Sequence, residues 1–289
     1  MQKIRIGNKT IGEGHPTYII AEIGINHNGD YDIARELVEV AAEAKVDAVK
    51  FQKRHLPSIY PQDVLDNPWK YEQSFQYLIP VLKEVELLKV DLVSLKNQAE
   101  SLGLEFICTP FDVISARFLS AIGVNAYKIA SCDLTNFDLL KQVIMTRKPL
   151  ILSTGMSTWE EIKEADHFLH KAEADYALLH CRSSYPVWPR EVNLKMINQL
   201  KVFGVPVGYS GHDIGTTIPL VAASMGACII EKHITLDQKA KGPDHKISLL
   251  PDELKVLVRD IRIADECMAD STRFLLRGEI LNKDVFRYR

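Results

Sequence analysis

Short apolar runs of β-forming residues alternate with helix-like segments along nearly the whole chain, and this alternation constrains the fold more than any other feature. Eight such runs are present, at residues 18–25, 48–52, 104–109, 126–131, 149–154, 176–182, 205–210 and 228–234. Most are continuously hydrophobic, as expected of parallel strands that helices cover on both faces. The sequence therefore predicts a repeated strand–helix unit and an α/β fold.

Segments with helical periodicity separate the apolar runs, and the clearest cover residues 31–44, 113–122, 137–146, 159–171, 194–203, 217–225 and 251–268. Glycines that predict C-terminal helix ends follow four helical runs, at Gly103, Gly123, Gly204 and Gly226. Ser157, followed by Glu160 and Glu161, indicates an N-terminal capping box. Between the second and third strands the connection is longer: residues 55–69 predict a loop, and residues 71–101 predict two helical pieces.

Polar residues occur at the C-terminal end of nearly every predicted strand, and they distinguish two possible sheets. An open doubly wound sheet would concentrate its ligand-binding residues at one switch point, whereas a closed barrel gathers all eight strand ends around one mouth. The distribution favours the barrel. We therefore predict a (β/α)₈ TIM barrel over residues 1–270, followed by a C-terminal tail at residues 271–289.

The charge and the cysteines exclude several classes of protein. The formal charge is -3, from 35 basic and 38 acidic residues, and no run of like charges suggests a nucleic-acid-binding arm. No apolar segment reaches the roughly 18 residues that a membrane span needs, and no secretory signal is evident. The 5 cysteines are scattered, with no CxxC pair. We expect a cytoplasmic protein with no nucleic-acid or membrane partner.

Lys50 and Lys128 each place an ammonium group inside an apolar strand, where an unpaired charge would cost several kcal/mol. One interpretation is a structural ion pair between Lys50 and Glu22; the other is a bound anion such as a phosphate or a carboxylate. Hydroxyl groups that can donate to the same anion follow neighbouring strands, at Thr109, Ser131, Ser153 and Ser183, although such residues also cap helices.

His212 and His233 lie one strand–helix unit apart, so they are expected at the ends of adjacent strands. Two neutral imidazoles can share a metal, and waters and substrate oxygens would complete its coordination, which favours Mn²⁺ or Mg²⁺ over a closed zinc site. A solvated loop residue or a general base remains the alternative for each. His27 is either a third ligand or a hydrogen-bonding residue of the first loop, and His180 is interpreted as a core histidine.

Eight segments resemble the motifs of sialic acid synthases, in the order typical of that family: IAEIGINHNGD at 20–30, VKFQ at 49–52, TPFD at 109–112, YKIAS at 127–131, STGM at 153–156, YSGH at 209–212, EKHIT at 231–235 and GPDH at 242–245. The resemblance covers the chain from about residue 15 to residue 265. It implies a transferase barrel that uses phosphoenolpyruvate and a divalent metal, with manganese or magnesium preferred, to make nine-carbon 2-keto-3-deoxy acids.

The resemblance also implies roles for individual residues. Phosphoenolpyruvate would be held by Lys50, Thr109, Lys128, Ser131, Ser153, Ser183 and Ser210. The metal would be held by His212 and His233, and the sugar would face Glu22, Gln52, Asp133, Tyr185 and Asp244. In the family mechanism the metal polarises the acceptor aldehyde, C3 of phosphoenolpyruvate attacks it, water adds at C2, and phosphate leaves with C–O cleavage. Glu22, Lys50, Lys128, His212 and His233 are the predicted catalytic residues.

Two departures from the family pattern bear on the acceptor. Asp133 stands where glutamate is usual, and Arg182 with Ser183 stands where a neutral residue followed by asparagine is usual, which indicates a different sugar specificity. The leading hypothesis is condensation with an open-chain N-acetylmannosamine-like sugar. The alternatives are another aldose or a 6-phosphate acceptor bound by Arg182, and a non-catalytic sugar-binding barrel, against which the histidines and lysines argue.

Residues 278–285 resemble the opening of a small antifreeze-like domain that follows the barrel in this family. In family members that domain lends an arginine to the sugar site of the partner subunit. Because residues 271–289 contain only a short segment of this kind, we expect a homodimer formed through the barrel, with an open acceptor site.

Overall fold

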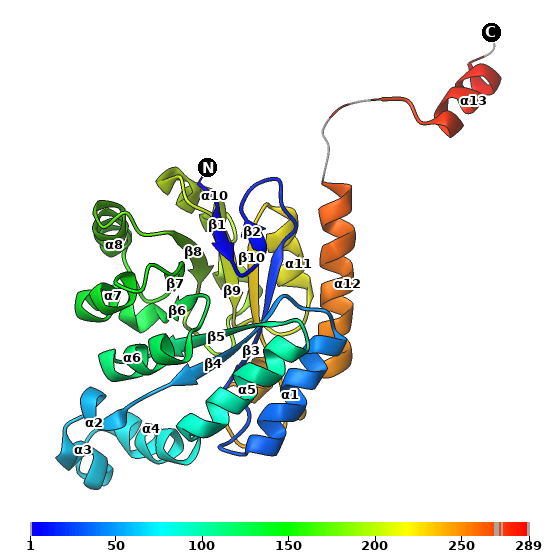
Figure 1. Cartoon of the computed structure of the whole chain (residues 1–289). Helices are drawn as coiled ribbons and strands as arrows, with labels where there is room; N and C mark the ends of the chain where they lie inside the picture. Colours follow the sequence, from blue (N-terminus) through cyan, green and yellow to red (C-terminus); the bar gives the residue numbers. More distant parts are fainter. Residues whose placement is uncertain (1, 269–271, 273, 288–289) are drawn as a thin grey trace.

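The computed structural model describes residues 2–268, 272 and 274–287. Eight parallel strands form a closed barrel in chain order, with the last strand paired to the first (Figure 1). Their bounds are β3 (Tyr18–Gly24), β4 (Ala48–Lys53), β5 (Glu105–Pro110), β6 (Tyr127–Ile129), β7 (Leu150–Ser153), β8 (Tyr176–Cys181), β9 (Val207–Gly211) and β10 (Ile229–His233). The predicted TIM barrel is confirmed.

Helices cover the outside of the barrel: α1 (Tyr31–Glu43), α5 (Lys89–Ser101), α6 (Val113–Ile122), α7 (Phe137–Ile144), α8 (Trp159–Lys171), α10 (Met196–Leu200), α11 (Thr217–Ser224) and α12 (Pro251–Cys267). Each buries an apolar stripe against the strands; in α1 the stripe is Ala34, Leu37, Val38 and Ala41. Burying a leucine or valine of this kind contributes about 1.5–3 kcal/mol. The packing of these stripes therefore positions the strands.

The N-terminal cap of α8 differs from the prediction. Thr158, rather than Ser157, is the N-cap residue: its hydroxyl accepts from the Glu161 N–H at 3.2 Å, and the Glu161 carboxylate accepts from the Thr158 N–H at 2.7 Å. The reciprocal pair needs a spacing of three residues, which Thr158 and Glu161 provide.

The long connection after β4 contains more helix than the sequence indicated. The predicted loop at residues 55–69 forms α2 (Leu56–Ile59), α3 (Gln62–Asp66) and the 3₁₀ turn η1 (Pro68–Lys70). Two further helices follow as predicted, α4 (Gln73–Glu84) and then α5. The apolar side chains of the connection form a small core of their own, made by Leu56, Val64, Leu65, Ile79 and Leu82.

A hairpin that the sequence did not reveal precedes the barrel. Strands β1 (Ile4–Ile6) and β2 (Lys9–Ile11) pair antiparallel through a two-residue turn, in which Gly7 has a left-handed φ of 55°. Its three isoleucines join the inward-facing side chains at the starts of the strands in one buried apolar cluster. The hairpin therefore closes the amino-terminal end of the barrel.

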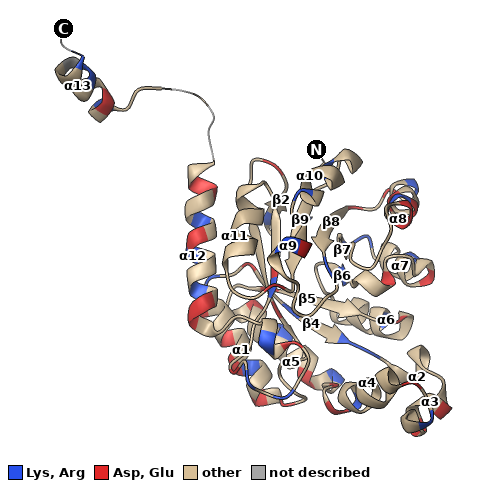
Figure 2. Cartoon of the chain, turned by 180° about the vertical axis from the view of Figure 1, so that it is seen from behind, with Lys and Arg blue, Asp and Glu red and all other residues tan. Residues whose placement is uncertain are grey.

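The C-terminal helix α13 (Arg277–Phe286) lies apart from the barrel in Figure 1. The barrel extends to the end of α12. Residues 269–271, 273, 288 and 289 lie outside the described residues. The predicted boundary between the barrel and the tail, at residue 271, therefore stays a prediction. Figure 2 shows acidic and basic residues interspersed along α12. In the part of the chain that the structure describes, no helix is both long and apolar enough to cross a membrane.

Candidate active site at the barrel mouth

A cavity of about 250 Å³ opens at the carboxyl ends of the barrel strands, and each of these eight strands contributes to its lining. It contains all of the predicted site residues except Asp133 and Arg182: Glu22, Lys50, Gln52, Thr109, Lys128, Ser131, Ser153, Ser183, Tyr185, Ser210, His212, His233 and Asp244. The barrel thus brings together residues that are up to about 220 positions apart in the chain.

Lys50 forms the buried ion pair that the sequence left open as one interpretation. Its Nζ lies 2.8 Å from Oε2 of Glu22 and donates to the Thr109 hydroxyl at 3.0 Å. Burial alone would lower the pKa of Lys50, but Glu22 and Glu231 outweigh burial and raise it. Burial raises the pKa of Glu22 to about 7, even though Lys50 opposes the shift. Lys50 is therefore a stable cation, and Glu22 exchanges its proton near neutral pH.

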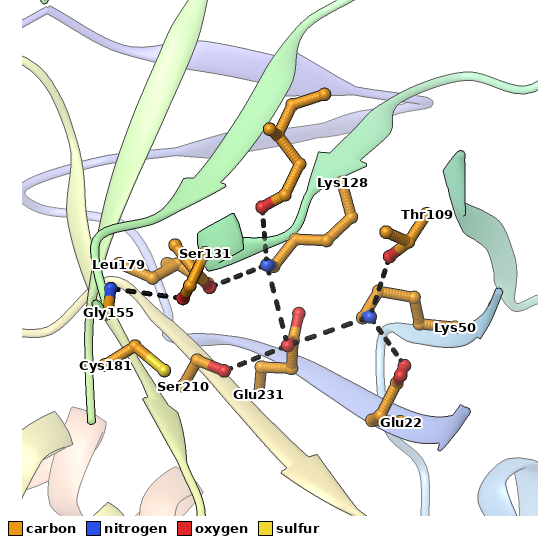
Figure 3. Close-up of polar contacts among 12 residues, drawn as sticks. Glu22, Lys50, Thr109, Lys128, Ser131, Gly155, Leu179, Cys181, Ser210 and Glu231 are labelled. Atoms are coloured by element: carbon orange, nitrogen blue, oxygen red, sulfur yellow. Dashed lines mark hydrogen bonds and ion pairs between the residues drawn. The ribbon is translucent and has the colours of Figure 1, made fainter. Parts of the chain in front are cut away.

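Glu231 lies between the two buried lysines, as Figure 3 shows. Its Oε1 is 3.8 Å from Nζ of Lys50 and 3.9 Å from Nζ of Lys128, and it accepts a hydrogen bond from Ser210 at 3.0 Å. Burial would raise the pKa of Glu231, but Lys128 and Lys50 lower it, so this carboxylate stays ionised. The sequence placed Glu231 at a strand end without assigning it a role. Its spacing of two from His233 on β10 is the signal that both face inward.

Lys128 is also directed into the cavity floor. Its Nζ donates to the Ser153 hydroxyl at 2.6 Å and to the Ile129 carbonyl at 3.0 Å. Burial lowers the pKa of Lys128, with Glu231 opposing the shift. With Glu22 partly protonated near pH 7 and Glu231 ionised, Lys50 and Lys128 leave the floor with a net positive charge. Such a floor attracts an anion.

Two serine hydroxyls meet beside these lysines because Gly155 has no side chain. The Gly155 N–H donates to Oγ of Ser131 at 3.1 Å (Figure 3). A Cβ at this position would lie 2.4 Å from Oγ of Ser183 and 2.7 Å from Oγ of Ser131. The turn after β7 therefore keeps the hydroxyls of Ser131 and Ser183 close together, and two adjacent hydroxyl donors suit phosphate oxygens.

His212 and His233 lie side by side at the ends of the adjacent strands β9 and β10, with ring centroids 5.6 Å apart. Burial lowers the pKa of His212 to about 4 and that of His233 far below its usual range, so both imidazoles are neutral. Nδ1 of His212 lies 2.7 Å from the Arg182 carbonyl and donates to it, which leaves Nε2 as a lone-pair donor.

The surroundings of the histidines fit a metal with an incomplete protein shell. Nδ1 of His233 is buried without a hydrogen-bond partner among the described residues, and Oδ2 of Asp244 is 4.0 Å away. Within those residues no group of three or more histidine, cysteine or acidic side chains has metal-binding geometry. Two nitrogen ligands with an open remainder are typical of an exchangeable catalytic ion.

Two predicted sugar-binding residues lie outside the cavity lining. Asp133 belongs to the 3₁₀ turn η2 (Ser131–Asp133), where its carboxylate accepts from the Asn136 amide at 2.9 Å. The Arg182 side chain is exposed, and only its carbonyl reaches the site, through His212. The role of both as direct sugar ligands stays a prediction without geometric support.

His27 makes a hydrogen bond within the first loop and His180 lies in the core, as one interpretation of each proposed. Nδ1 of His27 accepts from the Gly29 N–H at 3.0 Å, within the first loop. His180 is buried, with Nε2 2.6 Å from the Val192 carbonyl.

Arg54 also lines the mouth, although no motif in the sequence indicated it. Its guanidinium lies 3.7 Å above the Phe111 ring and donates to Oε1 of Gln52 at 2.6 Å. Lys50, Gln52 and Arg54 follow one another at intervals of two, the period at which side chains share one face of a strand. That alternation, continued one step beyond β4, is the signal that would have found Arg54.

Comparison with known proteins decides the family. Residues 37–273 match the family model for the NeuB family. The chain belongs to the NeuB family. The N,N'-diacetyllegionaminic acid synthase of Campylobacter jejuni is 40% identical over 94% of this chain and 83% of its own length.

The human N-acetylneuraminate-9-phosphate synthase is 34% identical over 93% of this chain and 76% of its own length. Among solved structures, the sialic acid synthetase of Leptospira borgpetersenii in complex with citrate superposes with a TM-score of 0.86 at 34% identity, covering 100% of this chain and 98% of that one. The resemblance to sialic acid synthases is confirmed at the level of the NeuB family.

Proposed function

We propose that the chain condenses phosphoenolpyruvate with an open-chain, N-acetylmannosamine-like sugar and water, giving a sialic-acid-type 2-keto-3-deoxy nonulosonate and phosphate. The observation that carries the proposal is a single cavity in which buried Lys50 and Lys128, bridged by Glu231, adjoin two neutral histidines. An anion site beside a metal site is what a reaction between phosphoenolpyruvate and an aldehyde requires.

Phosphoenolpyruvate binds over the cavity floor in this proposal. Lys50 and Lys128 neutralise its charge, and the hydroxyls of Thr109, Ser131, Ser153 and Ser183 donate to its oxygens. Ser210 turns its hydroxyl from Glu231 toward the substrate to do the same. The same cations then stabilise the phosphate that departs with C–O cleavage, because the negative charge on the leaving oxygens stays beside them.

His212 and His233 would hold a divalent metal, Mn²⁺ or Mg²⁺, through their neutral imidazoles. When bound, such an ion supplies Lewis-acid activation of the acceptor carbonyl oxygen. The chain's contribution is to keep both rings unprotonated and oriented: burial prevents their protonation, and the Arg182 carbonyl fixes the His212 ring.

Glu22 handles a proton in the proposed reaction. Its pKa of about 7 allows it to take a proton from the water that adds at C2, or to give one to the former aldehyde oxygen, without a large energetic cost in either direction. Oε1 of Glu22 accepts from the Gln52 amide at 3.0 Å, which fixes the carboxylate. Gln52, Tyr185 and Asp244 line the outer mouth and face the acceptor.

The acceptor has two candidates, because condensation adds three carbons before C1 of the aldose. A neutral hexosamine gives an unphosphorylated product, and a 6-phosphate gives a 9-phosphate of the kind in the human relative's name. The homodimer and the cytoplasmic location remain predictions from the sequence.

A phosphate-release assay tests the proposed function. The chain is mixed with phosphoenolpyruvate, Mn²⁺ and, in turn, hexosamines, hexoses and their 6-phosphates. We expect release that needs phosphoenolpyruvate, an acceptor and the metal together, with a 2-keto-3-deoxy acid as the second product. Acceptor binding without any phosphate release would instead identify a non-catalytic sugar-binding barrel.

A further inference from the structure

We propose that Arg54 is the specificity-determining residue of the acceptor site, and that it binds a phosphate group on the sugar. The acceptor is then a phosphorylated amino sugar, held at one end by the catalytic residues and at the other by Arg54. This inference rests on the proposed function, and it assigns a substrate class within it.

The position of Arg54 separates it from the lysines of the cavity floor. Lys50 lies inside β4, Gln52 near its end, and Arg54 just past it, so the three follow one another toward the opening. Arg54 lines the cavity together with Phe111, Cys132 and Asp244. A substrate group that reaches Arg54 therefore lies nearer the opening than a group bound on the floor.

The guanidinium lacks the counter-ion that the chain's buried cations have. The four buried lysines of the described chain each have a carboxylate within 4.0 Å, in the pairs Lys50–Glu22, Lys53–Glu86, Lys128–Glu231 and Lys232–Asp213. Arg54 is half-buried, yet no carboxylate of the described residues lies within 4.0 Å of its guanidinium. A desolvated cation that has no carboxylate within 4.0 Å, beside a cavity, favours an anionic ligand.

The contacts of the guanidinium leave it ready for such a ligand. One face rests on the Phe111 ring at 3.7 Å, and one N–H donates to Oε1 of Gln52 at 2.6 Å. These contacts fix the plane of the group but use only part of its five N–H donors. None of its nitrogens is both buried and without a hydrogen-bond partner. A fixed planar fork with free donors matches two phosphate oxygens.

Phosphoenolpyruvate and Arg182 do not account for this arrangement. In the proposed function, Lys50 and Lys128 on the cavity floor neutralise the charge of phosphoenolpyruvate, beside the serine hydroxyls around Gly155. Arg182, which the sequence suggested for an acceptor phosphate, has an exposed side chain outside the cavity lining. Arg54 lines the outer part of the cavity and is free to receive the distal end of the acceptor.

Arg54 also has a possible positioning role that the experiment must separate from binding. It donates to Gln52 at 2.6 Å, and Gln52 donates to Glu22 at 3.0 Å, so a chain of hydrogen bonds links Arg54 to the proton-transferring carboxylate. Loss of positioning would slow the reaction with every acceptor. Loss of a phosphate contact would affect only the phosphorylated one.

The test compares Arg54→Met, Arg54→Lys and the matched control Arg190→Met, whose side chain is exposed, with N-acetylmannosamine and its 6-phosphate as acceptors. For Arg54→Met we expect kcat/KM for the 6-phosphate to fall roughly 10- to 150-fold, the effect of one charge-assisted contact. The neutral acceptor and the KM for phosphoenolpyruvate should stay within about threefold. Arg54→Lys should retain part of the preference, because it keeps the charge but loses the fork.

Other outcomes overturn the proposal. Equal losses of kcat/KM with both acceptors would make Arg54 a positioning residue. A rise confined to the KM for phosphoenolpyruvate would assign Arg54 to that substrate. No change in any of these constants would mean that Arg54 lines the cavity without binding either substrate. If no acceptor supports phosphate release, the proposed function fails, and calorimetric titration of N-acetylmannosamine 6-phosphate still decides the inference. Weaker binding by Arg54→Met than by the folded wild type and Arg190→Met supports it; equal or absent binding contradicts it.

Discussion

The two ends of the barrel are made by the same strands, yet their inward-facing layers differ in chemistry. On β4 the inward side chains run from Ala48 to Lys50, on β10 from Ile229 to Glu231, and on β7 from Ile151 to Ser153. One step of two residues along each strand thus changes an apolar layer into a polar one, which carries the charged groups of the site. The amino-terminal layer packs under the β1–β2 hairpin, whereas the carboxyl-terminal layer surrounds a cavity.

The apolar layer makes the charged layer possible. It excludes water from below, so the ion pairs among Glu22, Lys50 and Glu231 lie in a medium of low polarity, where electrostatic interactions are strong and shift pKa values. We therefore expect substitutions at the mouth to change the rate of the reaction, and substitutions at the closed end to change the free energy of unfolding.

The largest effect is expected at the metal site. His212→Ala or His233→Ala should lower phosphate release more than about 1000-fold, or about 4 kcal/mol, because the remaining imidazole cannot hold the ion alone. The thermal unfolding midpoint should change little. His167→Ala, at an exposed position on α8, is the matched control. Near-normal turnover in either site variant, or after exhaustive chelation, would remove the metal from the mechanism.

The closed end should show the opposite behaviour. Ile6→Ala removes a fully buried side chain from the hairpin and should lower the free energy of unfolding by about 2–5 kcal/mol. At a temperature where the variant is folded, its kcat should match that of the wild type. Urea denaturation and the phosphate assay measure the two quantities, with exposed Ile263→Ala as the control. A large loss of kcat would show that the two layers are not separable.

Loss of the Lys128 charge from the cavity floor should weaken the binding of phosphoenolpyruvate, by less than the loss of a metal ligand reduces turnover. Lys128→Met keeps the side chain's length but removes the donor to Ser153 and the cation beside Glu231. We expect weaker binding of phosphoenolpyruvate by about 1.5–3 kcal/mol, the typical contribution of a charged hydrogen bond. Calorimetry measures this, and exposed Lys141→Met provides the comparison. Unchanged affinity would make Lys128 a structural residue.

The order of the strands and most of the site could be read from the sequence, because continuous apolar runs and polar strand ends are strong local signals. The predicted residues that lie outside the cavity lining, and the elements that differ from the prediction, do so for specific physical reasons. Arg182 follows Cys181 and precedes Ser183, both of which line the cavity, so strand alternation turns its side chain away.

The remaining differences arose where a local signal was too short or depended on contacts distant in sequence. Asp133 lies in a 3₁₀ turn, whose direction the preceding strand does not determine. The hairpin strands have only 3 residues each, too few for a periodic signal. Helices α2 and α3 depend on packing against α4, a contact that composition does not reveal.

The most specific prediction concerns the proton on Glu22. Its pKa in the folded chain is about 7, above the ordinary value of 4.5, so the folded state holds this proton more tightly than the unfolded state does. The resulting stabilisation is fully present below pH 4.5 and is lost as the pH rises through 7. The slope is at most about 1.4 kcal/mol per pH unit.

Glu22→Gln lacks this titration, so the difference in unfolding free energy between wild type and variant should fall across that range. Burial lowers the pKa of His212 to about 4, and its contribution runs in the opposite direction, being present above 6.5 and lost as the pH falls through 4. It is common to both proteins and cancels in the difference. Denaturation at a series of pH values measures the slope, with exposed Glu36→Gln as the control. A difference that does not vary with pH would place the Glu22 proton outside this range, and the charged layer would then lack the group that the proposed reaction needs for proton transfer near neutral pH.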